Sequence, residues 1–146
     1  MRLSTKGRYA VMAMTDLAAH QGSAGVRGAV CLADIAERQQ ISLAYLEQIF
    51  SRLRRREVVE SIRGPGGGYR LARGAAQTSI ADIVRAVDEP LKAVRCSGEE
   101  KLGCLKGGKR CATHALWDAM GRRIEDFLAG VSLEDVLAGR FDREAA

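Results

Sequence analysis

The sequence predicts a mainly α-helical protein in which a winged helix-turn-helix precedes a long dimerisation helix. Three observations lead to this fold class. Two short amphipathic segments meet at a tight turn within residues 32–55, a glycine-rich hairpin pattern follows at 58–71, and apolar residues recur at heptad spacing over 117–131. We therefore expect a winged helix-turn-helix DNA-binding region over residues 1–75, and a ligand loop with the dimerisation helix in residues 76–146.

Composition supports one soluble domain with a basic first half. The chain has 146 residues, enough to bury a core without disulfides. Residues 1–75 hold 12 Lys and Arg against 6 Asp and Glu, whereas residues 76–146 hold 11 against 12. A basic half indicates a polyanionic partner such as double-stranded DNA, although a solvated charged face is the simpler alternative.

The first helix is expected from Ser4, a good N-cap, to about Gln21, with an apolar face at Ala10, Ala13 and Met14. The start of the chain lacks the pattern of a signal peptide, and no apolar run approaches the roughly 20 residues that span a bilayer. We expect a cytoplasmic protein with no membrane partner. In that reducing compartment, clustered cysteines bind metal or do redox chemistry more often than they form disulfides.

The helix-turn-helix is predicted from a short helix over residues 32–39 and a second helix that Ser42 caps and that runs to about Arg55. Apolar residues of the second helix share one stripe, and its other face is polar and basic. The stripe consists of Leu46, Ile49, Phe50 and Leu53, and the outer face of Tyr45, Gln48, Arg52, Arg55 and Arg56.

The wing is predicted from the strand formers "VVESIR" and "YRL", which "GPGGG" at residues 64–68 separates. Arg63 and Arg70 flank this tip, and glycines without side-chain bulk let backbone N–H groups approach phosphates. A nucleotide cradle is a poor alternative, because no Lys-Ser/Thr follows and the loop lies between strands. A plain turn in a protein-binding module stays open.

Residues 73–79 are expected to form a linker, followed by a helix over 80–87. Further on, Trp117, Met120, Ile124, Phe127 and Val131 lie at intervals of 3, 4, 3 and 4 on a helix expected at about 113–131. This heptad seam favours a homodimer, since a two-fold pair reads two DNA half-sites. Packing onto the chain's own domain is the alternative. Ser132 would cap a last short helix.

Residues 96–114, "CSGEEKLGCLKGGKRCATH", contain three cysteines and a histidine separated by seven, six and two residues. Their polar, glycine-rich surroundings favour a metal or cluster site over buried thiols, with a thiol switch as the alternative. Cys96, Cys104, Cys111 and His114 could hold zinc or a 2Fe-2S cluster, and residue types do not separate the two. Cys31, between Val30 and Leu32, is instead expected to be a small core residue.

Four stretches together resemble the Rrf-type winged-helix transcription factors: "MRLSTKGRYAVMAM", "ISLAYLEQIFSRLRR", "RGPGGGYRL" and "CATHALW". The last is specific to the branch of iron-sulfur cluster regulators. The resemblance implies a homodimeric repressor and activator, not an enzyme, that controls cluster assembly genes and receives its 2Fe-2S cluster from the assembly machinery. It also implies cluster ligation by Cys96, Cys104, Cys111 and His114. The loops between these ligands are slightly longer than the family's common spacing.

The resemblance further assigns DNA reading to Ser42, Tyr45, Gln48 and Arg54 on the second helix, and to Arg63 and Gly66 on the wing. Glu47 would favour a cytosine amino group. Three other functions stay open: a zinc-stabilised DNA-binding protein, a nitric oxide or iron sensor of the same family, and a small redox enzyme. No Cys-x-x-Cys pair or nucleotide fingerprint supports the enzyme.

Overall fold

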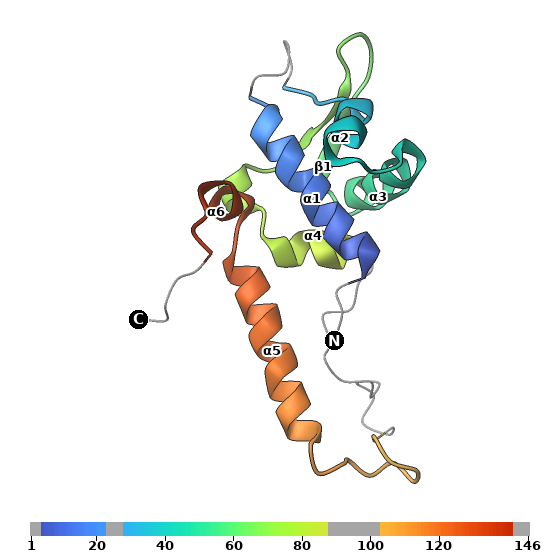
Figure 1. Ribbon diagram of the computed structural model, residues 1–146, viewed down its shortest axis with the longest axis vertical. Coiled ribbons are helices and arrows are strands. Elements are labelled where there is room, and N and C mark those ends of the chain that lie inside the picture. The colour runs from blue at the N-terminus through green and yellow to red at the C-terminus, as the bar shows by residue number, and fades with distance from the viewer. Residues whose placement is uncertain (1–3, 23–27, 88–102, 142–146) are drawn as a thin grey trace.

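A computed structural model describes residues 4–22, 28–87 and 103–141, and within them the fold is mainly helical with one small antiparallel sheet (Figure 1). This confirms the predicted fold class. The elements in chain order are α1 (Thr5–His20), α2 (Leu32–Gln39), α3 (Leu43–Arg55), β1 (Val59–Ile62), β2 (Gly68–Leu71), the 3₁₀ helix η1 (Ala75–Gln77), α4 (Ile80–Ala86), α5 (His114–Gly130) and α6 (Leu133–Ala138).

The helix-turn-helix has the predicted bounds. Gln40 ends α2 in the left-handed conformation, with φ 54°, and its N–H donates to the carbonyl of Ala36. Two residues later the Ser42 hydroxyl accepts a hydrogen bond from the N–H of Tyr45 at 3.3 Å and starts α3. The predicted apolar stripe of α3 is buried in full: Leu46, Ile49, Phe50 and Leu53.

The wing has the predicted hairpin, and a third segment joins it. β1 and β2 pair antiparallel, from Val59 opposite Leu71 to Ile62 opposite Gly68. Val30, just before α2, exchanges two backbone hydrogen bonds with Tyr69, at 2.8 and 2.9 Å. A Cβ on Gly68 would lie 2.2 Å from the carbonyl oxygen of Val30, so only glycine allows this close approach.

One hydrophobic core joins both halves of the chain, because α1 packs against α2, α3, α4 and α6. Met14 and Leu17 of α1, Ile83 of α4 and Leu133 of α6 are all fully buried in it. The boundary at residue 75 therefore does not separate two packed units. It stays a prediction about which part of the chain binds DNA and which part carries the ligand loop and the dimerisation helix. In the described residues, no helix combines the length and the apolar character that crossing a membrane needs.

The linker predicted at residues 73–79 is wrong. This segment contains η1, and Thr78 within it is buried. The carbonyl of Thr78 accepts a hydrogen bond from Leu133 N–H at 3.0 Å, and the carbonyl of Val131 accepts one from Ile80 N–H at 2.9 Å. These bonds fix the segment to the start of α6, a long-range pairing that local sequence does not reveal.

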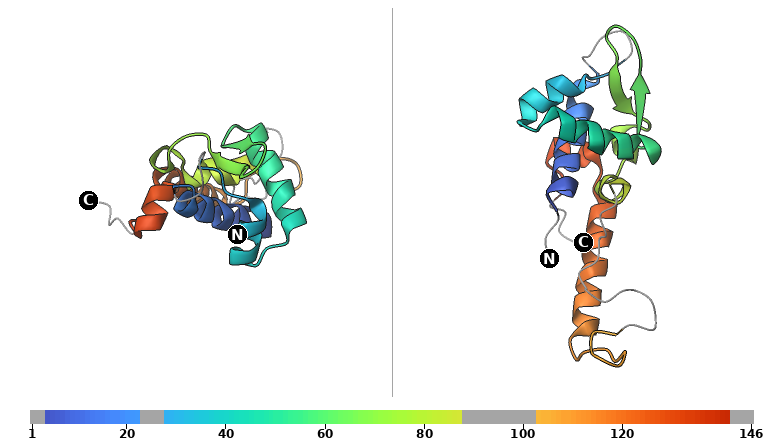
Figure 2. Two further views of the ribbon diagram at one scale, coloured as in Figure 1. Left: turned by 90° about the horizontal axis from the view of Figure 1, so that it is seen from above. Right: turned by 90° about the vertical axis from the view of Figure 1, so that its right-hand side faces the viewer.

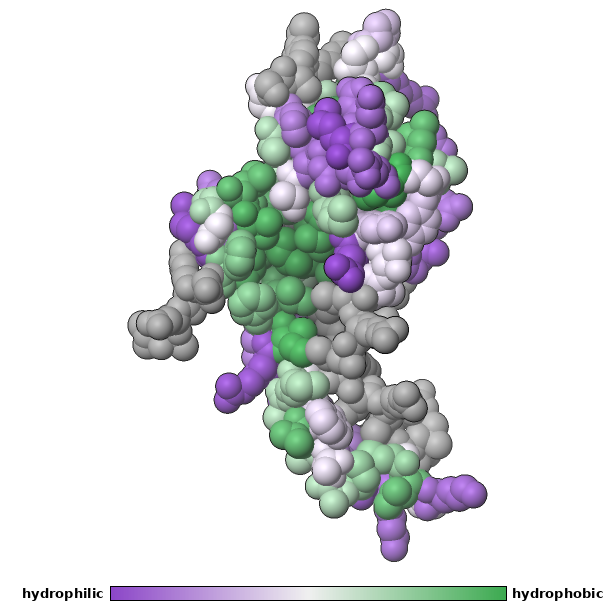
Figure 3. Space-filling model, viewed as in Figure 1, coloured by the Kyte–Doolittle hydropathy of each residue, from purple (hydrophilic) through white to green (hydrophobic). Residues whose placement is uncertain are grey.

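Helix α5 extends away from the body of the molecule toward the ligand loop (Figures 1 and 2). Of its predicted seam, Trp117 is 42% and Phe127 54% exposed, whereas Met120 and Ile124 are half-buried. Val131 is buried in the chain's own core, so the alternative of intramolecular packing is correct at that end. Apolar surface gathers where α6 and the upper part of α5 meet below α1 (Figure 3).

Asp16 is a buried carboxylate that joins α1 to α2. Its Oδ1 and Oδ2 accept hydrogen bonds from Arg38 at 2.7 to 3.2 Å, and Oδ2 accepts another from Gln39 at 2.8 Å. Burial by itself would raise the pKa of Asp16. The hydrogen bonds from Arg38 and Gln39, with the charges of Arg38 and His20, nevertheless hold that pKa below its ordinary value.

Candidate functional site

Helix α3 has a polar face, and the residues of this face extend from the N-cap to the last turn of the helix. Ser42, Glu47, Gln48 and Arg54 are exposed, as predicted for residues that reach DNA. Tyr45 differs, because it is half-buried and its ring meets that of Tyr9 edge-on, with the ring centroids 5.9 Å apart. The ring of Tyr45 thus also supports the contact between α1 and α3.

The wing tip presents Arg63 and Gly66, which are both exposed. The turn is closed by a hydrogen bond from Gly67 N–H to the carbonyl of Gly64 at 2.9 Å. A Cβ on Gly67 would lie 2.3 Å from the Ile62 carbonyl oxygen, so no larger residue fits there. Arg63 and the bare backbone of the tip are therefore available to a polyanion.

Arg70, which the sequence places beside the tip, instead faces Glu60 across the hairpin. The Arg70 Nη2 and Glu60 Oε2 atoms lie 3.0 Å apart. Both side chains are exposed, and such a pair contributes at most about 1 kcal/mol. Because a local carboxylate already neutralises Arg70, Arg63 is the stronger candidate for a phosphate contact on the wing.

The ligand loop brings two of its four predicted ligands together. Cys104 Sγ lies 3.1 Å from His114 Nδ1, at the first residue of α5. Cys111 precedes this helix, and its carbonyl accepts the N–H of His114 at 3.1 Å. Its Sγ lies 3.7 Å from Thr113 Oγ1. Cys96, the fourth predicted ligand, lies outside the described residues.

Glycines shape the tight return of this loop. Leu105 N–H donates to the carbonyl of Lys109 at 3.0 Å, and Gly107 and Gly108 have φ of 90° and 80°. A Cβ on Gly103 would lie 2.4 Å from the Lys109 carbonyl oxygen. The loop thus folds back on itself between Cys104 and Cys111.

The chemistry of this donor set fits a soft metal or an iron-sulfur cluster. Two donors bound to one tetrahedral metal at about 2.3 and 2.0 Å lie roughly 3.5 Å apart, close to the separation of Cys104 Sγ from His114 Nδ1. The described ranges contain no group of three His, Cys, Asp or Glu side chains placed to hold a metal ion. For all four residues to bind one metal or cluster, the Cys111 side chain would therefore have to turn toward Cys104 and His114, and Cys96 would have to approach them.

Cys31 corrects one prediction. It is exposed rather than buried, because it occupies the N-cap position of α2, where the chain turns at the surface. Its apolar neighbours Val30 and Leu32 misled the sequence interpretation: Val30 is buried and Leu32 half-buried, while the residue between them points outward.

Asp16 and Thr113 were missed by sequence reasoning. Asp16 lies one helical turn after Ala13 and beside Leu17 on the buried face of α1, a spacing that could have signalled a paired buried charge. Thr113 is separated from Trp117 by one helical turn, and the indole Nε1 donates to its Oγ1 at 3.2 Å. Nothing in the local sequence signals this second contact.

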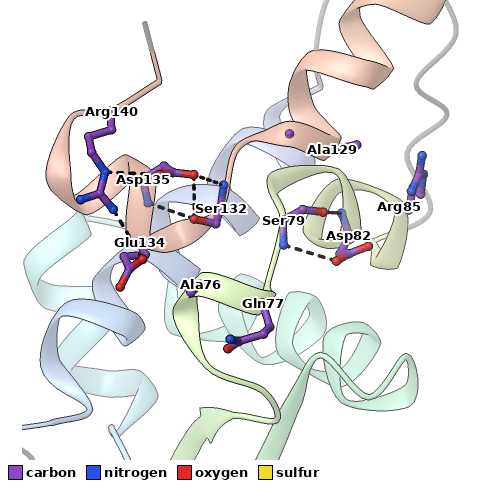
Figure 4. Close-up of a pocket in the computed structure, with 11 residues that line it drawn as sticks. Ala76, Gln77, Ser79, Asp82, Arg85, Ala129, Ser132, Glu134, Asp135 and Arg140 are labelled. Atoms are coloured by element: carbon purple, nitrogen blue, oxygen red, sulfur yellow. Dashed lines mark hydrogen bonds and ion pairs between the residues drawn. The ribbon is translucent and has the colours of Figure 1, made fainter. Parts of the chain in front are cut away.

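A hollow of about 580 Å³ opens where η1, α4, α6 and the end of α5 meet (Figure 4). Its polar groups bond one another in two matching helix starts. The Ser79 hydroxyl accepts Asp82 N–H at 3.1 Å, and the Ser132 hydroxyl accepts Asp135 N–H at 3.1 Å. Arg140 pairs with Asp135 at the rim. These contacts make the hollow part of the scaffold that joins α4 to α6.

Comparison with known proteins decides the family. The model of the Rrf2 family, described as an iron-dependent transcriptional regulator, matches residues 3–139. The chain belongs to the Rrf2 family. The HTH-type transcriptional regulator IscR of Xenorhabdus nematophila is 55% identical over 137 residues, which make up 94% of this chain and 79% of that protein.

Solved structures agree with this Rrf2 assignment. T. potens IscR has a TM-score of 0.75 and 34% identity, over 100% of this chain and 94% of that one. CymR, the global cysteine regulator of B. subtilis, has a TM-score of 0.77 and 30% identity, over 95% and 98%. These relatives confirm the resemblance and the winged helix.

As a member of the Rrf2 family, the chain is a DNA-binding transcriptional regulator and not an enzyme. The redox-enzyme alternative is therefore wrong.

Proposed function

We propose that this regulator binds a 2Fe-2S cluster through Cys96, Cys104, Cys111 and His114 and reports cluster supply to cluster assembly genes. The observation that carries the proposal is the 3.1 Å approach of Cys104 Sγ to His114 Nδ1 at the head of α5. When bound, the cluster would supply a redox-active and labile group, with an imidazole ligand that raises its reduction potential. Cluster assembly proteins would be the donor.

The DNA contacts we propose are those of α3 and the wing with double-stranded operators in the cytoplasm. Helix α3 would lie in the major groove, where Gln48 pairs with adenine and Glu47 with cytosine. Backbone and phosphate contacts would hold the register. The remaining residues proposed to touch DNA are Ser42, Tyr45, Arg54, Arg63 and Gly66.

A homodimer through α5 is the assembly we propose. Trp117, Phe127 and Leu116 are 42%, 54% and 59% exposed, and large apolar side chains that gather on an exposed surface often mark a protein–protein interface. Packing against a second copy would bury it and place two α3 helices on adjacent half-sites. The two copies would then read a two-fold symmetric operator.

Zinc is the competing occupant, because the same four residues satisfy tetrahedral zinc. Anaerobic purification with iron, sulfide and zinc analysis separates the two. We expect a coloured protein with equal amounts of iron and sulfide, and a colourless protein with one zinc would refute the cluster. A nitric oxide or iron sensor of the same family would hold iron but leave operator choice unchanged when cluster supply alone varies.

Variants of the ligands sharpen this experiment. Cys104→Ser and His114→Ala should lose the visible absorption, while Cys31→Ser keeps it, because Cys31 is an exposed cysteine outside the loop. Operator binding by cluster-bound and cluster-free protein should then differ for at least one class of natural site. Equal affinities at every site would overturn the sensing role.

A further inference from the structure

Thr113 stands at the N-cap of α5, yet its side chain bonds no backbone N–H of that helix. An N-cap hydroxyl ordinarily accepts from the second or third N–H of the first turn. Four other helices in the described part of the chain follow that rule, with caps at Ser4, Ser42, Ser79 and Ser132. The hydroxyl of Thr113 is instead engaged by two side chains.

Those side chains are Trp117 and Cys111. Trp117 Nε1 lies 3.2 Å from Thr113 Oγ1, and Cys111 Sγ lies 3.7 Å from the same oxygen. An indole N–H only donates, so Thr113 Oγ1 accepts from Trp117. The hydroxyl has a second lone pair and one hydrogen, so it also bonds Cys111 Sγ, with either atom of that contact as the donor. One hydroxyl thus links the indole of Trp117 to the sulfur of Cys111.

We propose that Thr113 is a positioning residue that couples Cys111 to the apolar face of α5 through Trp117. The inference rests on the proposed function in treating Cys111 as a ligand. Trp117 lies one turn into α5 and is 42% exposed on the predicted dimer seam. A change in where Cys111 Sγ lies therefore moves the partner of the Trp117 indole and reorients a side chain of the seam.

Trp117 is the only tryptophan in the chain, so its fluorescence reports on this contact directly. The probe is zinc ion, added to reduced, metal-free, full-length protein. Thr113→Val removes the hydroxyl and nearly keeps the shape, and Thr113→Ser keeps the hydroxyl as the matched control. Thr113 is exposed, so both variants should keep the far-UV circular dichroism of the wild type.

We expect zinc to shift the Trp117 emission in the wild type and in Thr113→Ser, and this shift to be lost in Thr113→Val while chelator competition shows that zinc still binds.

An unchanged zinc response in Thr113→Val would overturn the proposal, and so would a Thr113→Ser variant that behaves like Thr113→Val. The zinc measurement does not depend on which group the protein carries in the cell. A wild-type protein that never takes up iron and sulfide would refute the proposed function, and the emission shift would still decide the role of Thr113.

Discussion

Replacing Asp16 by asparagine should destabilise the fold by about 3 kcal/mol. The Asp16 side chain is 1% exposed and accepts charged hydrogen bonds from Arg38, the shortest at 2.7 Å. Breaking a buried ion pair costs about 3 to 5 kcal/mol. Arg38 is 36% exposed and water can solvate it afterwards, so the cost lies at the lower end. Asp118→Asn, at the exposed pair with Arg122, is the matched control and should cost less than about 0.5 kcal/mol.

The assay is urea unfolding at one fixed protein concentration, since a dimer's apparent stability depends on concentration. Its pH dependence tests the cause. Because the folded pKa of Asp16 is lowered, its contribution is fully present above the ordinary value of 3.8 and is lost as pH falls through the lower folded value. The advantage of wild type over Asp16→Asn should therefore not fall between pH 7 and pH 5.

Two results would refute this reasoning. If Asp16→Asn cost no more than Asp118→Asn, the buried pair would contribute no net stability. If the wild-type advantage fell between pH 7 and pH 5, burial would outweigh the hydrogen bonds from Arg38 and Gln39 and the pKa of Asp16 would be raised.

Gly68→Ala should cost at least about 2 kcal/mol and weaken operator binding, because its Cβ would meet the Val30 carbonyl at 2.2 Å. Gly66→Ala, with open space around its Cβ, should cost about 1 kcal/mol of backbone strain in the same unfolding assay. Phe127→Glu should give a monomer in sedimentation equilibrium, and a retained dimer would place the interface elsewhere. Glu47→Ala should relax operator choice in competition binding, where unchanged discrimination between site classes contradicts the role of this carboxylate.

Local signals predicted the helices and the hairpin because each depends on nearby residues. Ser42 as an N-cap, the stripe from Leu46 to Leu53 and the glycines of the wing all act within a few positions. The third wing segment at Val30 and the pairing of residues 78–80 with 131–133 could not be predicted, since they are backbone contacts between segments distant in sequence. The same limit explains the false linker.

The candidate site was predictable in residue type but not in arrangement. Spacing identified Cys104, Cys111 and His114 as soft donors near one helix start. Only the fold shows that Cys104 approaches His114, while Cys111 turns toward Thr113. The exposure of Cys31 could not be predicted, because at this helix start one residue points outward between a buried and a half-buried apolar neighbour.

Distance decides how the ligand loop can influence DNA binding. Helix α5 has 17 residues, so its ends lie about 25 Å apart. Its last turn is tied to the DNA-reading body where Val131 is buried, and its first turn carries His114 at the loop. This separation disfavours direct contact between the ligand loop and α3 of the same chain. In the proposed dimer, a second copy packed along α5 would carry the effect of the loop to DNA. Phe127→Glu should then abolish the effect of a metal or cluster at the loop on operator binding, while the metal or cluster itself still binds.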